Sequence, residues 1–260
     1  MESTKPMDIF GAIKRQDMKA VIQYIAQQSD LNIKNSSNQT VVQYAASFAG
    51  NSPIAKSIYQ AIGLKLFWDR VNYARSMFVV FWYGFFQEQK EEHLEFLDSC
   101  NPKFFRYFCN IWADYVYLDI CRFADKRSDC FTVHYWLNEV FNGSKINLAP
   151  NAKAAYASIL DIAEQAKDAR DKIIAHTSRA ALYENNPLSQ MPNGAKDFET
   201  YYQSMEVLVN EIAAKIGNGM TIRYGFLPLH DLGEAPGEEV IKLLKLGMEK
   251  REEQLSRRAA

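Results

Sequence analysis

The stretch AKAAYASILDIAEQAKDARDKIIAH, residues 152–176, decides the fold class of this chain. It is rich in strong helix formers and contains no glycine or proline. Its apolar residues recur at three- and four-residue steps, which places them on one face of a helix. This predicted face consists of Ala155, Ile159, Ile162, Ala166, Ala169 and Ile173. The pattern predicts a long helix that is buried along one side.

The same period continues on both sides of this stretch. It predicts further helices over residues 64–92, 102–125, 132–141, 198–216 and 238–254. Loops are predicted where Gly, Pro and Asn gather, at residues 184–194 and 217–237. No segment alternates apolar and polar residues as a half-buried strand does, so the predicted fold class is all-α.

Composition and charge limit the function classes. The chain has 260 residues, of which 48% are hydrophobic, so it can bury a sizeable core. Its formal net charge is -1, whereas a protein that coats nucleic acid is usually markedly basic. Any contact with RNA must therefore come from a local basic patch.

The sequence shows no targeting or membrane segment. The start MESTKPMDIF lacks the basic residues and apolar run of a signal peptide. The strongest apolar run, Met77–Phe86, is too short for a bilayer, which needs about 20 residues. We expect this run to lie in a buried core helix and the protein to be cytoplasmic.

The four cysteines do not form a recognisable metal or redox motif. They are Cys100, Cys109, Cys121 and Cys130. No pair has the two-residue spacing of a zinc knuckle or a redox motif. We expect reduced and mostly buried thiols, and neither a metal nor another cofactor.

Residues 1–63 contain a weak repeat with a period of 33 residues. Ala12-Ile13 recurs as Ala45-Ala46, and Val21 recurs as Ile54. The segment NQTVVQYAASFAGNSPIAKSIYQAIG, residues 38–63, resembles a degenerate ankyrin repeat, although Val-Val-Gln stands where that family has Pro-Leu-His. Two ordinary helical hairpins are the alternative. We predict an ankyrin-like helical segment at 1–63 and a separate helical domain at 64–260.

Four histidines are the candidates for acid–base chemistry, because phosphate-loop, dinucleotide, nucleophile-elbow and His-Glu-x-x-His motifs are absent. His93 follows a polar stretch and is expected to be exposed. His134 lies among aromatic residues, which favours a place in the core or at its edge. His230 falls in an irregular stretch, whereas His176 ends the helix quoted above.

The end of that helix carries a family resemblance. Arg170-Asp171-Lys172-Ile173-Ile174-Ala175-His176 resembles the active-site motif of the HEPN superfamily, in its abortive-infection type. In that motif a polar residue directly follows the Arg, and four to six residues separate the Arg from the His. The spacing alone also fits Arg127 with His134 and Arg223 with His230. The pair Arg170 and His176 is preferred because it lies on a continuous predicted helix and because the polar Asp171 follows the Arg. Pro228 interrupts any helix between Arg223 and His230.

The resemblance implies an all-α HEPN-like bundle and a metal-independent endoribonuclease used in phage defence or as a toxin. In that reaction His176 is the general acid and base, and Arg170 stabilises the charge on the phosphate. Asp171 orients one of them, and Lys172 helps to bind the substrate. The implied partners are RNA, a second copy of the chain, and an antitoxin or other protein.

Helix geometry also bears on the expected homodimer. Six residues advance a straight helix by about 600°, which leaves Arg170 and His176 about 120° apart. One helix therefore does not place both side chains on one face. Members of the superfamily bring the motifs of two protomers together in one cleft, so we expect the same here.

Other readings of these residues stay open. Lys and His near a helix C-terminus also suit the helix dipole, without any chemistry. The chain is then a non-catalytic HEPN-like scaffold, or a regulatory module that binds a protein through its ankyrin-like segment. A third alternative is a sensor that binds a nucleotide in the same cleft.

Overall fold

The structure is a computed structural model that describes residues 8–27, 30–81, 102–127, 129–142, 148–169, 195–217, 223–226, 243 and 245–251. This part of the chain holds helices, turns and loops, with one isolated β-bridge between Lys34 and Thr40 and no strand. The predicted all-α fold class is confirmed. None of the helices described is long and apolar enough to cross a membrane.

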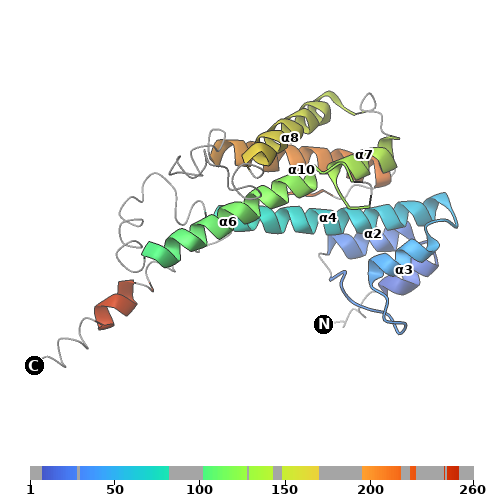
Figure 1. Cartoon of the computed structure of the whole chain (residues 1–260). Helices are drawn as coiled ribbons and strands as arrows, with labels where there is room; N and C mark the ends of the chain where they lie inside the picture. Colours follow the sequence, from blue (N-terminus) through green and yellow to red (C-terminus); the bar gives the residue numbers. More distant parts are fainter. Residues whose placement is uncertain are drawn as a thin grey trace, which may run out of the picture. The chain divides into compact units, whose positions relative to one another are not determined.

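Eight helices have assigned bounds within these ranges (Figure 1). They are α1 (Ile9–Lys14), α2 (Met18–Ala26), α3 (Val41–Phe48), α4 (Pro53–Phe81), α6 (Pro102–Phe123), α7 (Val133–Phe141), α8 (Pro150–Ala169) and α10 (Ala195–Gly217). The helices predicted at 102–125, 132–141 and 198–216 are confirmed with small shifts of their ends. α4 begins earlier than the predicted residue 64. The reason is local, because Ser52 Oγ accepts a hydrogen bond from the Ala55 N–H at 3.0 Å and Pro53 suits a first helical position.

The chain divides into two compact units. Unit 1 comprises residues 1–72, 121–164 and 196–225, and unit 2 comprises residues 73–120, 165–195 and 226–260. Helices α4, α6 and α8 each contribute residues to both units. The predicted boundary between residues 63 and 64 falls inside α4, so the division into two sequence domains stays a prediction.

Side-chain caps begin the short N-terminal helices. Asp8 caps α1 and Asp17 caps α2, each accepting a hydrogen bond from a backbone N–H of the first turn, at 2.9 and 3.0 Å. Thr40 and Gln43 form a reciprocal capping box at the start of α3. These contacts satisfy N–H groups that a helix start otherwise leaves unpaired.

The 33-residue repeat is only partly reflected in burial. Ala12 and Ala45 are 0% and 1% exposed, so these two positions are equivalent. Val21 is fully buried, whereas Ile54 is 51% exposed. The helices also differ, since α2 has 9 residues and α4 has 29. The ankyrin-like character of this segment stays a prediction.

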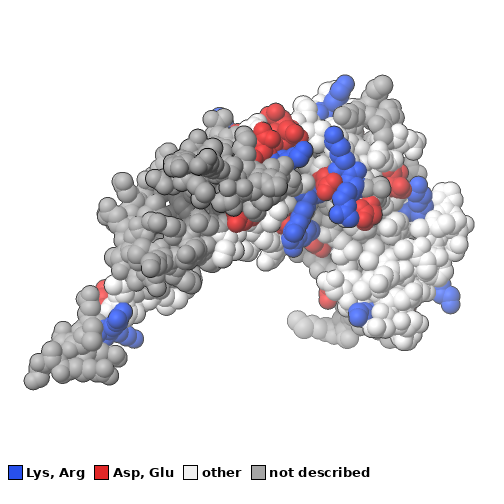
Figure 2. Space-filling model, in the orientation of Figure 1, with Lys and Arg blue, Asp and Glu red and all other residues white. Residues whose placement is uncertain are grey.

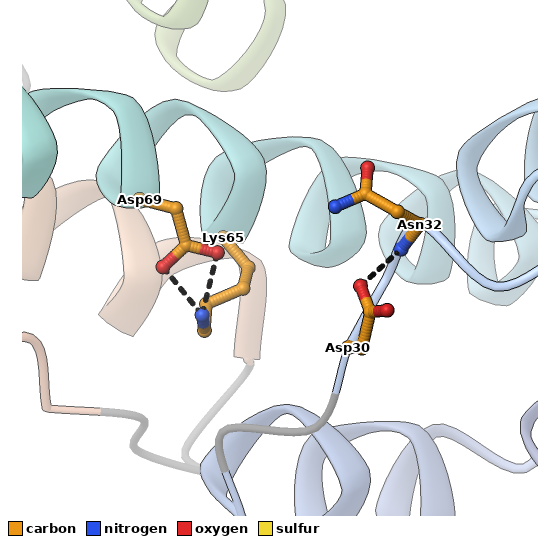
Figure 3. A network of polar contacts seen from close by, with 4 residues as sticks. All are labelled: Asp30, Asn32, Lys65 and Asp69. Atoms are coloured by element: carbon orange, nitrogen blue, oxygen red, sulfur yellow. Dashed lines mark hydrogen bonds and ion pairs between the residues drawn. The ribbon is translucent and has the colours of Figure 1, made fainter.

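Polar side chains shape the loop between α2 and α3. Figure 3 shows Asp30, whose Oδ1 accepts a hydrogen bond from the Asn32 N–H at 2.8 Å. Further along, Asn35 Oδ1 accepts from the N–H groups of Ser37 and Gln39 at 3.0 and 2.9 Å. The loop is therefore held by its own hydrogen bonds.

Figure 3 also shows an ion pair on α4. The Lys65 ammonium donates to both carboxylate oxygens of Asp69, one turn further along, at 2.5 and 2.7 Å. Only 12% of the Lys65 side chain is exposed, against 48% for Asp69. The carboxylate thus compensates an ammonium group on a side chain that is largely withdrawn from water.

Aromatic rings form the core of unit 1. Phe67 of α4 lies edge-on to Phe123, with ring centroids 5.7 Å apart, and 6.5 Å from Trp136 of α7. Trp136 is 0% exposed and stacks on Phe131 at 5.3 Å. A Cβ at Gly63 would lie 3.0 Å from Phe131 Cζ and 3.1 Å from Trp136 Cη2. The missing side chain at Gly63 lets these two rings pack directly against α4.

Replacing Gly63 with leucine should therefore destabilise the protein. Overpacking a filled site costs about 1–3 kcal/mol, which outweighs the better helix propensity of leucine, about 1 kcal/mol. We expect a lower thermal unfolding midpoint for Gly63→Leu, measured by circular dichroism. The matched control is Gly50→Leu, because nothing lies within 4 Å of a Cβ at Gly50. Equal losses in both variants would contradict the packing role of Gly63.

A side-chain amide fixes the segment after α10. Asn210 Nδ2 donates to the Tyr224 carbonyl at 2.7 Å, and Asn210 Oδ1 accepts from the Tyr224 N–H at 2.8 Å. The Tyr224 side chain is 5% exposed, and its ring lies 5.6 Å from that of Trp68 on α4. Burial first, and the nearby charge of Asp69 second, raise the pKa of the Tyr224 hydroxyl. Asn210 thus satisfies both backbone groups of Tyr224, as a neighbouring strand would.

Truncation of this amide should loosen that segment. Asn210→Ala leaves both backbone groups of Tyr224 without their partner, which costs about 1–3 kcal/mol for each buried group. We expect a lower unfolding midpoint and much faster hydrogen exchange at the Tyr224 amide. Exchange at α7 amides serves as the internal reference. Unchanged protection of the Tyr224 amide would show that the amide pair does not hold the segment.

Unit 2 has its own apolar core. Its buried described side chains include Ala74, Phe78, Val79, Val116, Tyr117, Ile120 and Ala166. The Arg75 guanidinium lies over the Phe226 ring, 4.5 Å from its centroid, as a cation–π contact. Tyr73 of α4 is 52% exposed, so this aromatic side chain meets solvent.

Candidate functional site

The predicted site residues directly follow, in sequence, the last described residue of α8 (Pro150–Ala169). They are Arg170, Asp171, Lys172 and His176, and all four lie outside the described residues. The structure describes α8, which ends at Ala169, directly before Arg170. The packing of α8 is therefore the part of the site that the structure tests.

α8 buries the face that the sequence predicts. The buried side chains are Ala152, Ala155, Tyr156, Ile159, Ile162, Ala163 and Ala166. The opposite face is polar, and Glu164, Lys167 and Asp168 near its C-terminal end are exposed. The predicted face is confirmed as far as Ala166, whereas the side chains of Ala169 and Ile173 are outside the described part. One side of α8 packs on the protein and the other meets solvent.

The second Arg–His spacing begins at Arg127, in the loop after α6. The guanidinium of Arg127 forms a fork with Asp129, with Nε–Oδ1 at 3.0 Å and Nη2–Oδ2 at 2.7 Å. This pairing lowers the pKa of the Asp129 carboxyl and raises the pKa of Arg127. Both side chains are more than half exposed, so the pair is a solvated surface contact of small energetic value.

His134 of the same spacing is engaged elsewhere. It lies in the first turn of α7, half-buried, and its Nδ1 shares a hydrogen bond of 3.0 Å with the Tyr156 hydroxyl. The two rings meet edge to face, with centroids 5.8 Å apart. Burial raises the pKa of Tyr156, which keeps the phenol protonated. The predicted place of His134 at the edge of the core is confirmed, and its contact with α8 is structural in character.

The third spacing is described only at one end. Arg223 lies exposed in the segment that Asn210 holds, and no regular structure is assigned at residues 223–226. His230, like His93, lies outside the described residues. The absence of a helix at Arg223 agrees with the expectation that this spacing is not part of a continuous helix.

Two carboxylates of α6 were missed by the sequence reasoning. Asp119 is 0% exposed, and it is the one charged side chain among the buried residues that the structure describes. Asp114 is half-buried, and burial raises the pKa of its carboxyl. Helical spacing could have identified Asp119 from the sequence, because this residue falls between Val116 and Phe123 on the buried face of α6. Buried or shifted carboxylates mark functional-site candidates as well as structural networks.

The raised pKa of Asp114 predicts a specific dependence on pH. At low pH the carboxyl is protonated in both the folded and the unfolded chain, so its burial carries no charge penalty. Above the raised folded pKa the folded state bears the desolvation cost of the carboxylate. We expect Asp114→Asn to raise the thermal unfolding midpoint at pH 7 and to lose this advantage as pH falls through the pKa. A gain that stays constant with pH would contradict this cause.

The described residues contain no group of three or more His, Cys, Asp and Glu that could hold a metal ion. Cys121 is half-buried and Cys130 is exposed, and neither forms a disulfide. The prediction of a mostly buried set is wrong for Cys130, because this residue lies in the loop before α7. The side chains of Cys100 and Cys109 are not among those described.

Comparison with known proteins places the chain in a family. The family model HEPN_AbiU2, described as AbiU2, matches residues 64–233. No curated protein and no solved structure matches the chain. The matched span covers more than half of the chain and includes the predicted site residues, whereas residues 1–63 lie outside it.

Proposed function

The chain belongs to the HEPN_AbiU2 family, and from this premise we propose that it is a metal-independent endoribonuclease that acts in phage defence or as a toxin. The observation that carries the proposal is the family match over residues 64–233, which contains the motif Arg170-Asp171-Lys172-Ile173-Ile174-Ala175-His176. This motif has the residue types that RNA cleavage needs without a metal.

The chemistry follows from the substrate. RNA carries a 2′-hydroxyl beside each scissile phosphate, so cleavage needs a base, an acid and stabilisation of negative charge. Histidine is the side chain whose ordinary pKa lies nearest neutrality, so His176 serves as general base and general acid. Arg170 stabilises the phosphate with its planar fork of donors. Asp171 orients the Arg or the His, and Lys172 adds a positive charge for substrate binding.

We propose that two protomers form the cleft together, because residues with the spacing of Arg170 and His176 do not share one face of a straight helix. Exposed apolar side chains in unit 2 support a protein contact there. Ile111 on α6 is 68% exposed and Tyr73 on α4 is 52% exposed. Large apolar groups in water favour association. A cytoplasmic location and an antitoxin or other protein partner belong to the same proposal.

Local packing supports the choice of Arg170 over Arg127. The Arg127 guanidinium is paired with Asp129, and the His134 ring is bonded to Tyr156. The two side chains of that competing spacing thus serve separate contacts. An arginine that binds phosphate presents its planar guanidinium to the substrate, whereas the guanidinium of Arg127 contacts Asp129.

A non-catalytic scaffold that binds a protein through residues 1–63 is the second candidate. The formal net charge of -1 favours it, because such a chain has no general attraction for RNA. The absence of charged residues from Asn35 to Ala55 favours it as well, since the cores of protein interfaces are depleted of charge.

Cleavage of RNA in EDTA tests the proposal. Total RNA and tRNA are incubated with the wild-type protein, with His176→Asn and with the matched control His134→Asn. Loss of a general acid–base residue should lower the cleavage rate by about 10²–10⁴-fold in His176→Asn. His134→Asn should keep its activity, and all three proteins are compared at equal folded fraction by circular dichroism.

The other outcomes each reject a part of the proposal. Equal cleavage by wild type and His176→Asn would place the activity elsewhere. Cleavage that appears only with Mg²⁺ would reject the metal-independent reaction. No cleavage of either RNA by the wild type would favour the scaffold.

A further inference from the structure

The arginines of this chain differ in what their side chains contact. The formal net charge is -1, and Figure 2 shows basic and acidic side chains interspersed on the visible face rather than one basic patch. Affinity for an RNA backbone depends on cations that its phosphates can reach. An arginine that already contacts another residue of the chain is less available to a phosphate. The contacts of each arginine therefore decide which of them can bind RNA.

Several of the described arginines are engaged within the chain. The Arg127 guanidinium contacts Asp129, and Arg70, Arg75 and Arg122 also interact with other residues. In the part of the chain that the structure describes, the exposed arginine side chains that form no hydrogen bond, ion pair or ring contact are Arg15, Arg223 and Arg251. Of these, Arg223 is the one that lies within residues 64–233, which match the family.

The backbone next to Arg223 is fixed by a side-chain amide that uses all of its donors. Asn210 Nδ2 donates to the carbonyls of Glu206 and Tyr224 at 2.9 and 2.7 Å, and Asn210 Oδ1 accepts from the Tyr224 N–H at 2.8 Å. Tyr224 is 5% exposed and its ring packs near Trp68. The backbone position of Arg223 is thus set by the residue that follows it.

Exposure alternates along this segment. Arg223 is exposed, Tyr224 is buried and Gly225 is exposed. This alternation is that of an extended chain, in which successive side chains point to opposite sides. Burial of the Tyr224 ring therefore turns the Arg223 side chain toward solvent. Because the backbone is already held, a ligand of Arg223 causes a smaller loss of conformational entropy on binding.

We propose that Arg223 is an anchor that binds a backbone phosphate of the RNA substrate. This inference rests on the proposed function, since it takes RNA as the ligand. The planar fork of an arginine matches two oxygens of one phosphate. Arg223 belongs to unit 1, whereas Arg170 and His176 belong to unit 2, so we assign to Arg223 a phosphate other than the scissile one.

The anchor has a consequence for the class of substrate. A contact to phosphate positions the RNA but carries no information about its sequence. An RNA that gains from Arg223 must also be long enough to occupy the proposed cleft at the same time. The preferred substrate is therefore a long RNA such as tRNA, and a short oligonucleotide gains nothing from Arg223.

Binding of tRNA over a series of KCl concentrations tests this anchor. The full chain carries His176→Asn so that the RNA stays intact, and fluorescence anisotropy of labelled tRNA gives the Kd with and without Arg223→Gln. Loss of one exposed ionic contact should raise the Kd about 2–5-fold. The dependence of log Kd on log KCl should become shallower by about 0.7–0.9, the value for one phosphate.

Arg127→Gln in the same background is the matched control. It removes the same charge from an arginine that already contacts Asp129, so the Kd and its salt dependence should stay unchanged. In the chain with His176 intact, Arg223→Gln should raise KM for tRNA and leave kcat unchanged, because the contact lies away from the reacting phosphate. Thermal melts confirm that each variant is folded.

Three results would overturn the anchor: a salt dependence that Arg223→Gln leaves unchanged, an equal change in Arg127→Gln, or no binding of tRNA at any salt concentration. The proposed cleavage is judged separately, because the Kd is measured without turnover. A shallower salt dependence in Arg223→Gln, together with no cleavage by the wild type, would support the anchor and count against the cleavage alone.

Discussion

The structure of unit 1 depends on the burial of the middle of α4, where no residue from 57 to 68 is exposed. Five consecutive residues of α4, from Gln60 to Leu64, are buried, which one apolar stripe on a helix cannot explain. Phe123 at the end of α6 contacts Phe67 of α4, and Tyr224 after α10 contacts Trp68. Trp136 of α7 packs at Gly63. Because α6, α7 and the segment after α10 all contact α4, the packing of these elements depends on the shape of α4.

This burial explains why sequence periodicity works for some helices and fails for others. α8 has one face on the protein and one in water, so its apolar positions repeat with the helical period and its face is predicted correctly. The middle of α4 lacks that contrast, and the predicted boundary between residues 63 and 64 falls inside this helix. Its actual start depends on a local signal, the hydroxyl of Ser52 followed by Pro53. The repeat in residues 1–63 is reflected only in part, because Ala12 and Ala45 are both buried whereas Ile54 matches Val21 in type but not in burial.

For the site, spacing alone proved a weak guide and side-chain partners a stronger one. All three Arg–His spacings fall within the residues that match the family, so the match does not choose between them. Arg127 and His134 do not act as a pair in the structure, because Arg127 contacts Asp129 and His134 contacts Tyr156. No sequence pattern predicts that Asp129 is the partner of Arg127. Asp119 could be found from helical spacing as a polar residue on a buried face. What a buried carboxylate stabilises depends on tertiary contacts, which spacing does not specify.

The near-zero net charge is consistent with an RNA-cleaving dimer if charge is unevenly distributed. In the proposed cleft, two protomers bring two copies each of Arg170 and Lys172 to one place, so the local field is positive although each chain has a formal charge of -1. Residues 35–55 show the opposite arrangement, since none of them is charged. A surface without cations does not compete with the proposed cleft for RNA.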